Sequence, residues 1–217
     1  MNREADHLEY QIPFSQAEYM QTLVRSHFPE ADLAECLKIE RELSFSDIRV
    51  RVWYCPEQEK LLLVVMTLGT DFDDLIEKYE KEEELLLAYA VECLAMEVLK
   101  KAYDIFPEKL YEREGKYPGE YHFLDDEEMR RMPELLKEMK IREVSCNEAF
   151  ALVPQKTVVF MTDLSDKKNA GCISVCETCG REDCPNRTRG REVRAAGLNY
   201  GYQRILGNGG NRLWRKD

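Results

Sequence analysis

A long and mostly apolar segment of the chain, residues 85–106, reads LLLAYAVECLAMEVLKKAYDIF. Apolar residues fall on almost every side of a helix drawn through it, and such a helix is normally central and buried. The helical pattern begins near residue 72 after a cap at Thr70 or Asp71, and the glutamates at residues 82–84 predict that it is split there. We therefore expect a fold organised around one long buried helix.

Strand patterns occur on both sides of this helical region. Residues 46–54 alternate apolar and polar side chains, and residues 61–67 form a nearly unbroken apolar run. With a turn at residues 56–59 they predict a hairpin. Two more short strands are expected at residues 149–153 and 157–162. The predicted fold class is therefore α+β, with a mainly antiparallel sheet packed against long helices.

Other helices are expected at residues 14–28, 31–43 and 125–139. Ser15, followed by Glu18 three residues later, predicts the N-cap of the first, and Pro133 predicts a kink or a late start in the last. Residues 107–124 are rich in Tyr, Gly, Pro and charge, so we expect a long ordered loop there.

The composition excludes several classes of protein. The 217 residues are 44% hydrophobic and 34% charged, which is typical neither of a disordered chain nor of a membrane protein. The apolar runs are much shorter than the roughly 20 residues that a bilayer span needs. Because the N-terminal residues are charged and lack the apolar core of a signal peptide, we expect a cytoplasmic protein.

Charge is distributed unevenly along the chain. Residues 187–217 contain eight basic and two acidic residues, a net charge of +6, whereas the rest of the chain carries −17 and the whole chain −11. An acidic surface repels phosphates, so it argues against nucleic acid as a general partner. The basic segment at residues 187–217 is the one part of the chain whose net charge would attract phosphates.

The cysteines are also unevenly distributed. Four are scattered and are interpreted as core residues: Cys36, Cys55, Cys93 and Cys146. The other four form one short cluster with the spacing C-x3-C-x2-C-x4-C: Cys172, Cys176, Cys179 and Cys184. Four thiolates this close can bind a four-iron, four-sulfur cluster or a zinc ion. The compressed spacing and Pro185 after the last cysteine favour the iron–sulfur cluster, and unliganded thiols remain the third interpretation.

Several segments resemble a known family in order and spacing. The segment at residues 64–69, VVMTLG, is followed by Asp73 and then by YAVECLAME at residues 89–97; residues 145–158 read SCNEAFALVPQKTV. Together they resemble the reactivation domain of cobalamin-dependent methionine synthase, and most closely its free-standing versions. The resemblance covers about residues 40–187, and it implies the α+β fold of that domain with an added four-cysteine motif.

The resemblance implies a function in corrinoid-dependent methyl transfer. Proteins of this family bind S-adenosylmethionine, dock on a cobalamin-carrying methyltransferase or methionine synthase subunit, and allow oxidised cob(II)alamin to be reduced and remethylated. An iron–sulfur cluster on the same chain would suit the supply of single electrons, with an electron-donor protein as a further partner.

The resemblance also implies ligand-binding residues. The family binds S-adenosylmethionine through an Arg-x-x-x-Gly-Tyr motif in a loop, to which Arg113, Gly119 and Tyr121 correspond here; Gln155 and Lys156 match a second block. In this chain Arg113 lies six residues before Gly119 rather than four, and Glu120 separates Gly119 from Tyr121. An arginine would pair with the ligand carboxylate, and a glycine would allow close backbone approach.

The sequence thus predicts three parts: an α+β body at residues 1–168, a cysteine module at 169–187 and a basic tail at 188–217. The leading hypothesis is an accessory protein for reductive reactivation of a corrinoid enzyme. An alternative from another class is a non-catalytic module, in which the cysteines hold structural zinc and the basic tail docks on nucleic acid or an acidic partner. A sensor of corrinoid or S-adenosylmethionine that performs no chemistry is a third.

Overall fold

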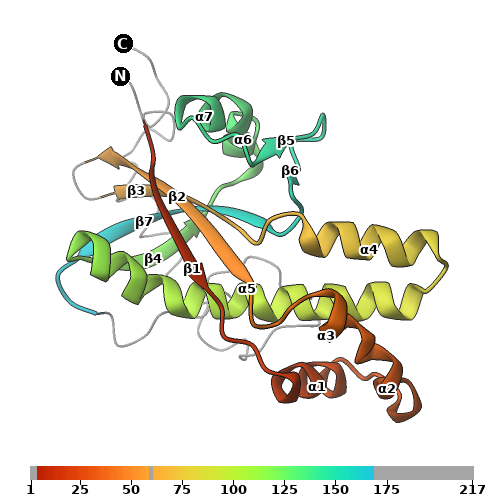
Figure 1. Cartoon of the computed structure of the whole chain (residues 1–217). Helices are drawn as coiled ribbons and strands as arrows, with labels where there is room; N and C mark the ends of the chain where they lie inside the picture. Colours follow the sequence, from red (N-terminus) through yellow and green to blue (C-terminus); the bar gives the residue numbers. More distant parts are fainter. Residues whose placement is uncertain (1–3, 59–60, 169–217) are drawn as a thin grey trace, which may run out of the picture.

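A five-stranded antiparallel sheet forms the centre of the protein, with strand order β1-β2-β3-β7-β4 (Figure 1). The computed structural model describes residues 4–58 and 61–168. The strands of this sheet are β1 (Asp6–Gln11), β2 (Arg49–Gln58), β3 (Leu61–Thr67), β4 (Tyr117–Phe123) and β7 (Thr157–Ser165). A separate two-stranded ribbon pairs β5 (Ser145–Cys146) with β6 (Leu152–Val153). The predicted α+β class and the β2–β3 hairpin are confirmed.

Helices cover both faces of the sheet (Figure 1). The helices are α1 (Gln16–Arg25), the short η1 (Glu30–Asp32), α2 (Leu33–Cys36), α3 (Lys38–Glu42), α4 (Asp71–Lys81), α5 (Leu85–Glu114), α6 (Asp126–Met129) and α7 (Met132–Glu138). One face packs on α5, with α4 and α1 beside it, and forms the larger core. The other face packs on α6 and α7 and forms a smaller core. Adjacent residues of β2 point to opposite cores, Tyr54 to the larger and Trp53 to the smaller, as strand geometry requires.

The long central helix follows the prediction closely. Residues of α5 are buried on several sides, and α4 and α5 are separate helices. The break falls at Glu83, whose φ of 61° is left-handed and ends α4. Ser15 and Glu18 form the predicted capping box of α1. The single helix expected at residues 125–139 is instead divided into α6 and α7, and Pro133 lies in the first turn of α7.

The expectation of a loop at residues 107–124 is wrong. α5 continues through Pro107 to Glu114, because Phe106 and Leu110 are buried against the sheet and hold the helix beyond the proline. Gly115 then ends the helix with a φ of 66°, and β4 follows as an edge strand. Pro118 is tolerated at this edge, since the free side of the strand needs no N–H donor.

Two smaller expectations also need correction. Residues 31–43 form three short helices rather than one, η1, α2 and α3. β2 continues past the turn expected at residue 56 and accommodates Pro56 in a β-bulge. Of the scattered cysteines, Cys36 and Cys55 are buried as predicted, whereas Cys93 and Cys146 are half-buried at the margins of the two cores.

Within residues 4–58 and 61–168, no helix combines the length and the hydropathy that crossing a bilayer requires. The cysteine module and the basic tail lie outside the described residues.

Candidate functional site

Two segments that are far apart in sequence meet where β3 ends and β7 begins. Thr67 is the register partner of Thr157, and their hydroxyl oxygens lie 2.7 Å apart. The Leu68 N–H then donates to the Lys156 carbonyl at 3.1 Å. The Gly69 N–H donates to Thr67 Oγ1 at 3.1 Å, with a φ of 80° at Gly69 that favours glycine. The turn after β3 is therefore fixed to the start of β7.

The first turn of α4 is held to the same place. The Gln155 N–H donates to Asp73 Oδ2 at 2.6 Å. The other carboxylate oxygen, Asp73 Oδ1, is buried and has no hydrogen-bond partner among the described residues. We call Thr67, Gly69, Asp73, Gln155 and Lys156 the junction. It ties the end of β3, the start of α4 and the start of β7 into one unit.

An ion pair connects the junction to α5. Lys156 Nζ lies 2.7 Å from Glu92 Oε2, and the Lys156 side chain is only 6% exposed while that of Glu92 is 42% exposed. A buried ammonium needs a partner, because its desolvation costs several kcal/mol. Glu92 therefore fixes the position of Lys156, and through it the start of β7, relative to the central helix.

A groove of about 620 Å³ opens beside the junction. Its lining includes Arg49 and Arg51, which alternate along β2 and so point to the same side of the sheet. The start of α4 contributes Asp71 and Asp74. The remaining lining comes from the segment before β2, the turn after β3, α4 and the β5–β6 region: Glu42, Leu43, Ser44, Asp47, Ile48, Thr67, Leu68, Gly69, Thr70, Phe72, Leu75, Lys78, Glu143 and Pro154. The groove is therefore lined by both basic and acidic side chains.

The charges around the groove differ in how far they are already neutralised. Glu9 pairs with both arginines, at 2.9 Å from Arg49 and 3.6 Å from Arg51, so one carboxylate serves two guanidinium groups.

The acidic side chains of the groove also differ in their partners. Glu42 accepts hydrogen bonds from Lys78 and from the Tyr79 hydroxyl, and the bond from Lys78 holds the pKa of Glu42 below its usual value. Asp71 and Asp74 have no ion pair with a described cation. A ligand would thus meet two guanidinium groups that share one carboxylate, together with the carboxylates of Asp71 and Asp74.

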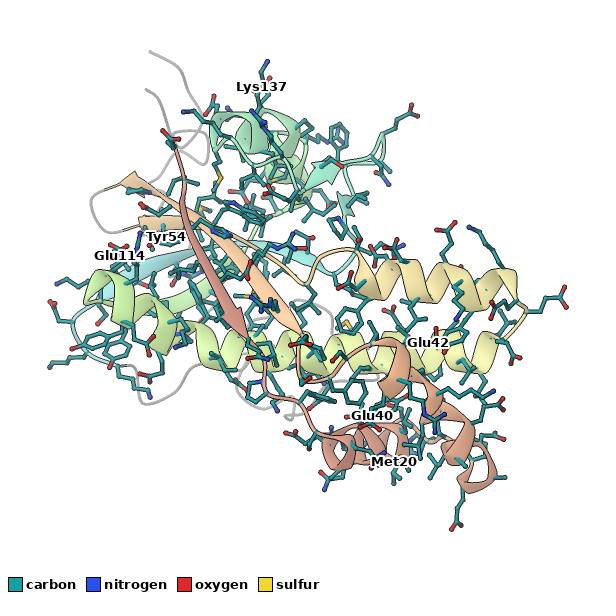
Figure 2. The ribbon with its side chains drawn as sticks, viewed as in Figure 1. Met20, Glu40, Glu42, Tyr54, Glu114 and Lys137 are labelled. Carbon is teal, nitrogen blue, oxygen red and sulfur yellow. The ribbon has the colours of Figure 1, made fainter. Side chains whose placement is uncertain are left out.

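The structure divides the predicted ligand residues into two groups. Gln155 and Lys156 belong to the junction, whereas Arg113 is in the last turn of α5. Arg113 and Glu92 are 21 residues apart on one helix, which corresponds to about 31 Å. In Figure 2, Glu114, the neighbour of Arg113 in sequence, lies with Tyr54 at one end of α5, whereas Glu42 lies toward the other end, near α3 and α4. One small ligand cannot contact both groups.

The other two predicted residues have structural roles at this far end. Tyr121 is 5% exposed, and its ring lies 4.5 Å from that of Phe160 in the larger core. Gly119 lies in β4 at an irregularity in the pairing with β7, where a Cβ would be 1.9 Å from Asp163 Oδ1. The close approach that glycine permits here is therefore to a neighbouring strand.

We expect Gly119→Ala to destabilise the protein by about 1 kcal/mol, because the added methyl group forces the Asp163 carboxylate out of its position. Urea denaturation measures the change. The double variant Gly119→Ala with Asp163→Ala should recover most of the loss, since the obstructing carboxylate is gone. If Gly119→Ala leaves the free energy of unfolding unchanged, the steric explanation is wrong.

The predicted metal ligands Cys172, Cys176, Cys179 and Cys184 lie outside the described residues. In the part of the chain that the structure describes, no group of three or more His, Cys, Asp or Glu side chains is arranged to hold a metal ion. The four-cysteine site therefore stays a prediction from sequence.

Comparison with models of known protein families finds no match, and a search of curated proteins also finds none.

The sequence singles out Gln155 and Lys156 as ligand-binding residues, but it predicts neither their contacts in the junction nor the groove. Arg49 and Arg51 are the polar positions of an alternating strand, and Asp71 and Asp74 have the pattern of an acidic first turn of a helix. The one signal in the sequence is the pair of arginines on one face of a strand, Arg49 and Arg51.

Proposed function

We propose that this chain is an accessory protein for reductive reactivation of a corrinoid-dependent methyltransferase, such as cobalamin-dependent methionine synthase. The observation that supports this most directly is the junction. The segments that carry the family resemblance, residues 64–73, 89–97 and 145–158, are joined by the Thr67–Thr157, Asp73–Gln155 and Glu92–Lys156 contacts. Segments that resemble one family in sequence thus also form one unit in space.

The four-cysteine motif supplies the second part of the proposal. Cys172, Cys176, Cys179 and Cys184 would hold an iron–sulfur cluster, which when bound supplies single electrons at low potential. The described chain ends at Lys168, whose ammonium pairs with Glu108 of α5. Glu108 lies five residues before Arg113 on the same helix. We propose that Arg113 provides positive charge on the side of the thiolates.

We place S-adenosylmethionine in the groove rather than at Arg113. This ligand carries a carboxylate together with an ammonium and a sulfonium group, so it needs both signs of charge. Arg49 and Arg51 suit the carboxylate, because guanidinium groups bind carboxylates in a bidentate manner. Asp71 and Asp74 suit the two cationic groups. The net effect is to orient the ligand along the groove beside the junction.

Ligand binding in the groove has a direct test. At about 100 times its dissociation constant, S-adenosylmethionine should stabilise the protein by about 2.7 kcal/mol, which raises Tm by roughly 5–10 °C. The double variant Arg51→Gln with Asp74→Asn should lose this shift. Arg113→Gln should keep it, since Arg113 is at the far end of α5. Loss of the shift in Arg113→Gln, with the groove variant unaffected, would place the ligand at the other end.

S-adenosylhomocysteine provides the matched ligand control, because it lacks the sulfonium charge and the transferable methyl group. We expect a smaller thermal shift for it than for S-adenosylmethionine. An equal thermal shift for the two ligands would mean that Asp71 and Asp74 do not interact with the sulfonium group.

A further inference from the structure

An apolar surface lies where α1 packs beside α5. Val24, Leu85 and Tyr89 are 59%, 67% and 53% exposed, which makes them the most exposed of the large apolar side chains in the described part of the chain. The Tyr89 ring stacks on Phe28 with centroids 5.3 Å apart, and Leu85 lies one turn before Tyr89 on the same face of α5. Met20, labelled on α1 in Figure 2, is half-buried and lies one turn before Val24 on the same helix. We call Met20, Val24, Phe28, Leu85 and Tyr89 the α1–α5 patch.

The α1–α5 patch includes a hollow and is attached to α5 by an ion pair. A shallow hollow of about 440 Å³ is lined by Met20, Gln21, Val24 and Arg25. Arg25 Nη2 lies 3.2 Å from Glu97 Oε1, so the hollow is fastened to α5 by an ion pair. A rigid aromatic surface loses little conformational entropy when another segment covers it. The patch is therefore suited to docking.

Acidic residues border the patch. Glu82, Glu83 and Glu84 immediately precede Leu85, all three are exposed, and none pairs with a cation in the described part of the chain. Apolar surface with an acidic rim favours a basic partner that also carries apolar side chains. A second copy of the chain is disfavoured, because it would bring two acidic rims together.

We propose that the α1–α5 patch is the docking surface for the basic tail, residues 188–217 of the same chain. This tail holds seven basic residues against two acids, so it complements the rim, and it also contains Tyr200, Tyr202, Leu213 and Trp214 to cover the patch. The proposal goes beyond the reactivation function and does not depend on it.

The chain is long enough for this contact. Lys168 is tied to Glu108, which is 23 residues from Leu85 along α5, or about 35 Å. Apart from the cysteine motif at residues 172–184, the 18 residues at 169–171 and 185–199 span up to about 59 Å, so Tyr200 and the residues that follow it can reach the patch. Linkage within one chain also gives the tail an effective concentration in the millimolar range, so a weak contact suffices.

Docking predicts that the tail is protected from protease in a salt-dependent way. Full-length protein is treated with dilute trypsin under native conditions, and mass spectrometry follows cleavage after the tail arginines, from Arg189 to Arg215. We expect Tyr89→Glu and Val24→Glu each to accelerate this cleavage about tenfold, because cleavage follows the undocked population. For the wild type, about 0.5 M salt should produce a similar acceleration by screening the contact with the rim.

Tyr111→Glu is the matched control, since Tyr111 is an exposed tyrosine near the opposite end of the same helix. Its tail should be cut at the wild-type rate. Equal cleavage rates in all variants and at both salt concentrations would overturn the proposal. So would protection that arises only when an oligonucleotide is added, which would make nucleic acid the occupant. A change from dimer to monomer in Tyr89→Glu, seen by size exclusion, would instead identify a second copy as the occupant and would also overturn it.

Discussion

Cys179→Ala should reduce the iron content of anaerobically prepared protein from about four atoms per chain to almost none, and should remove an absorption band near roughly 400 nm. A four-iron cluster held by this short motif uses all four of its thiolates, so the motif has no other cysteine that could replace the lost one. Iron analysis and the absorption spectrum of the same sample measure both changes.

Cys146→Ala is the control, because Cys146 is a half-buried free thiol in the described part of the chain. It should keep both the iron and the band. A colourless wild type with one zinc ion per chain would contradict the electron-transfer function and would favour the non-catalytic module. In that case the basic tail, rather than a cluster, would be the functional part of the C-terminal region.

Glu92→Leu should destabilise the protein by about 1–3 kcal/mol, because it leaves the buried Lys156 ammonium without its partner. Urea denaturation gives the free energy of unfolding. For comparison, Glu77→Leu breaks a pair with Lys81 in which the side chains are 62% and 71% exposed. That change should cost less than about 1 kcal/mol, since exposed ion pairs contribute little.

A second variant separates the charge effect from other effects of the substitution. Glu92→Leu combined with Lys156→Met replaces both charges with apolar groups of similar length, and it should recover most of the lost stability. If Glu92→Leu costs no more than Glu77→Leu, then Lys156 does not depend on Glu92. The junction would then be held by its hydrogen bonds alone.

The parts of the fold that are predictable are those encoded in contiguous sequence. The apolar run at residues 85–106 predicts the central helix, and the Ser15–Glu18 pair predicts a helix start, because both signals are local. The loop expected from Pro107 onward is wrong because that prediction also uses only a local signal. The local preference of Pro107 ends a helix, but burial of Phe106 and Leu110 against the sheet outweighs that preference, and no local signal reports this packing.

The candidate site also has one part that contiguous sequence indicates and one part that it does not. Gln155 and Lys156 lie in one short block and are predictable from it. The groove, in contrast, is assembled from segments between Glu42 and Pro154, so its charge pattern exists only in the folded chain. Gly119 is predicted from the resemblance as a ligand-binding position; the structure shows a close approach there to Asp163, which depends on the register of β4 with β7.

The most direct test of the proposed function is the remethylation of an inactive corrinoid enzyme. A cobalamin-dependent methionine synthase module in the cob(II)alamin state is mixed anaerobically with a reductant and S-adenosylmethionine, and the corrinoid spectrum is followed with and without this chain. We expect the chain to convert the spectrum to that of methylcobalamin at a rate that increases with its concentration, and Cys179→Ala to fail. A cob(II)alamin spectrum that stays unchanged in the presence of the iron-loaded wild type would contradict the proposed function.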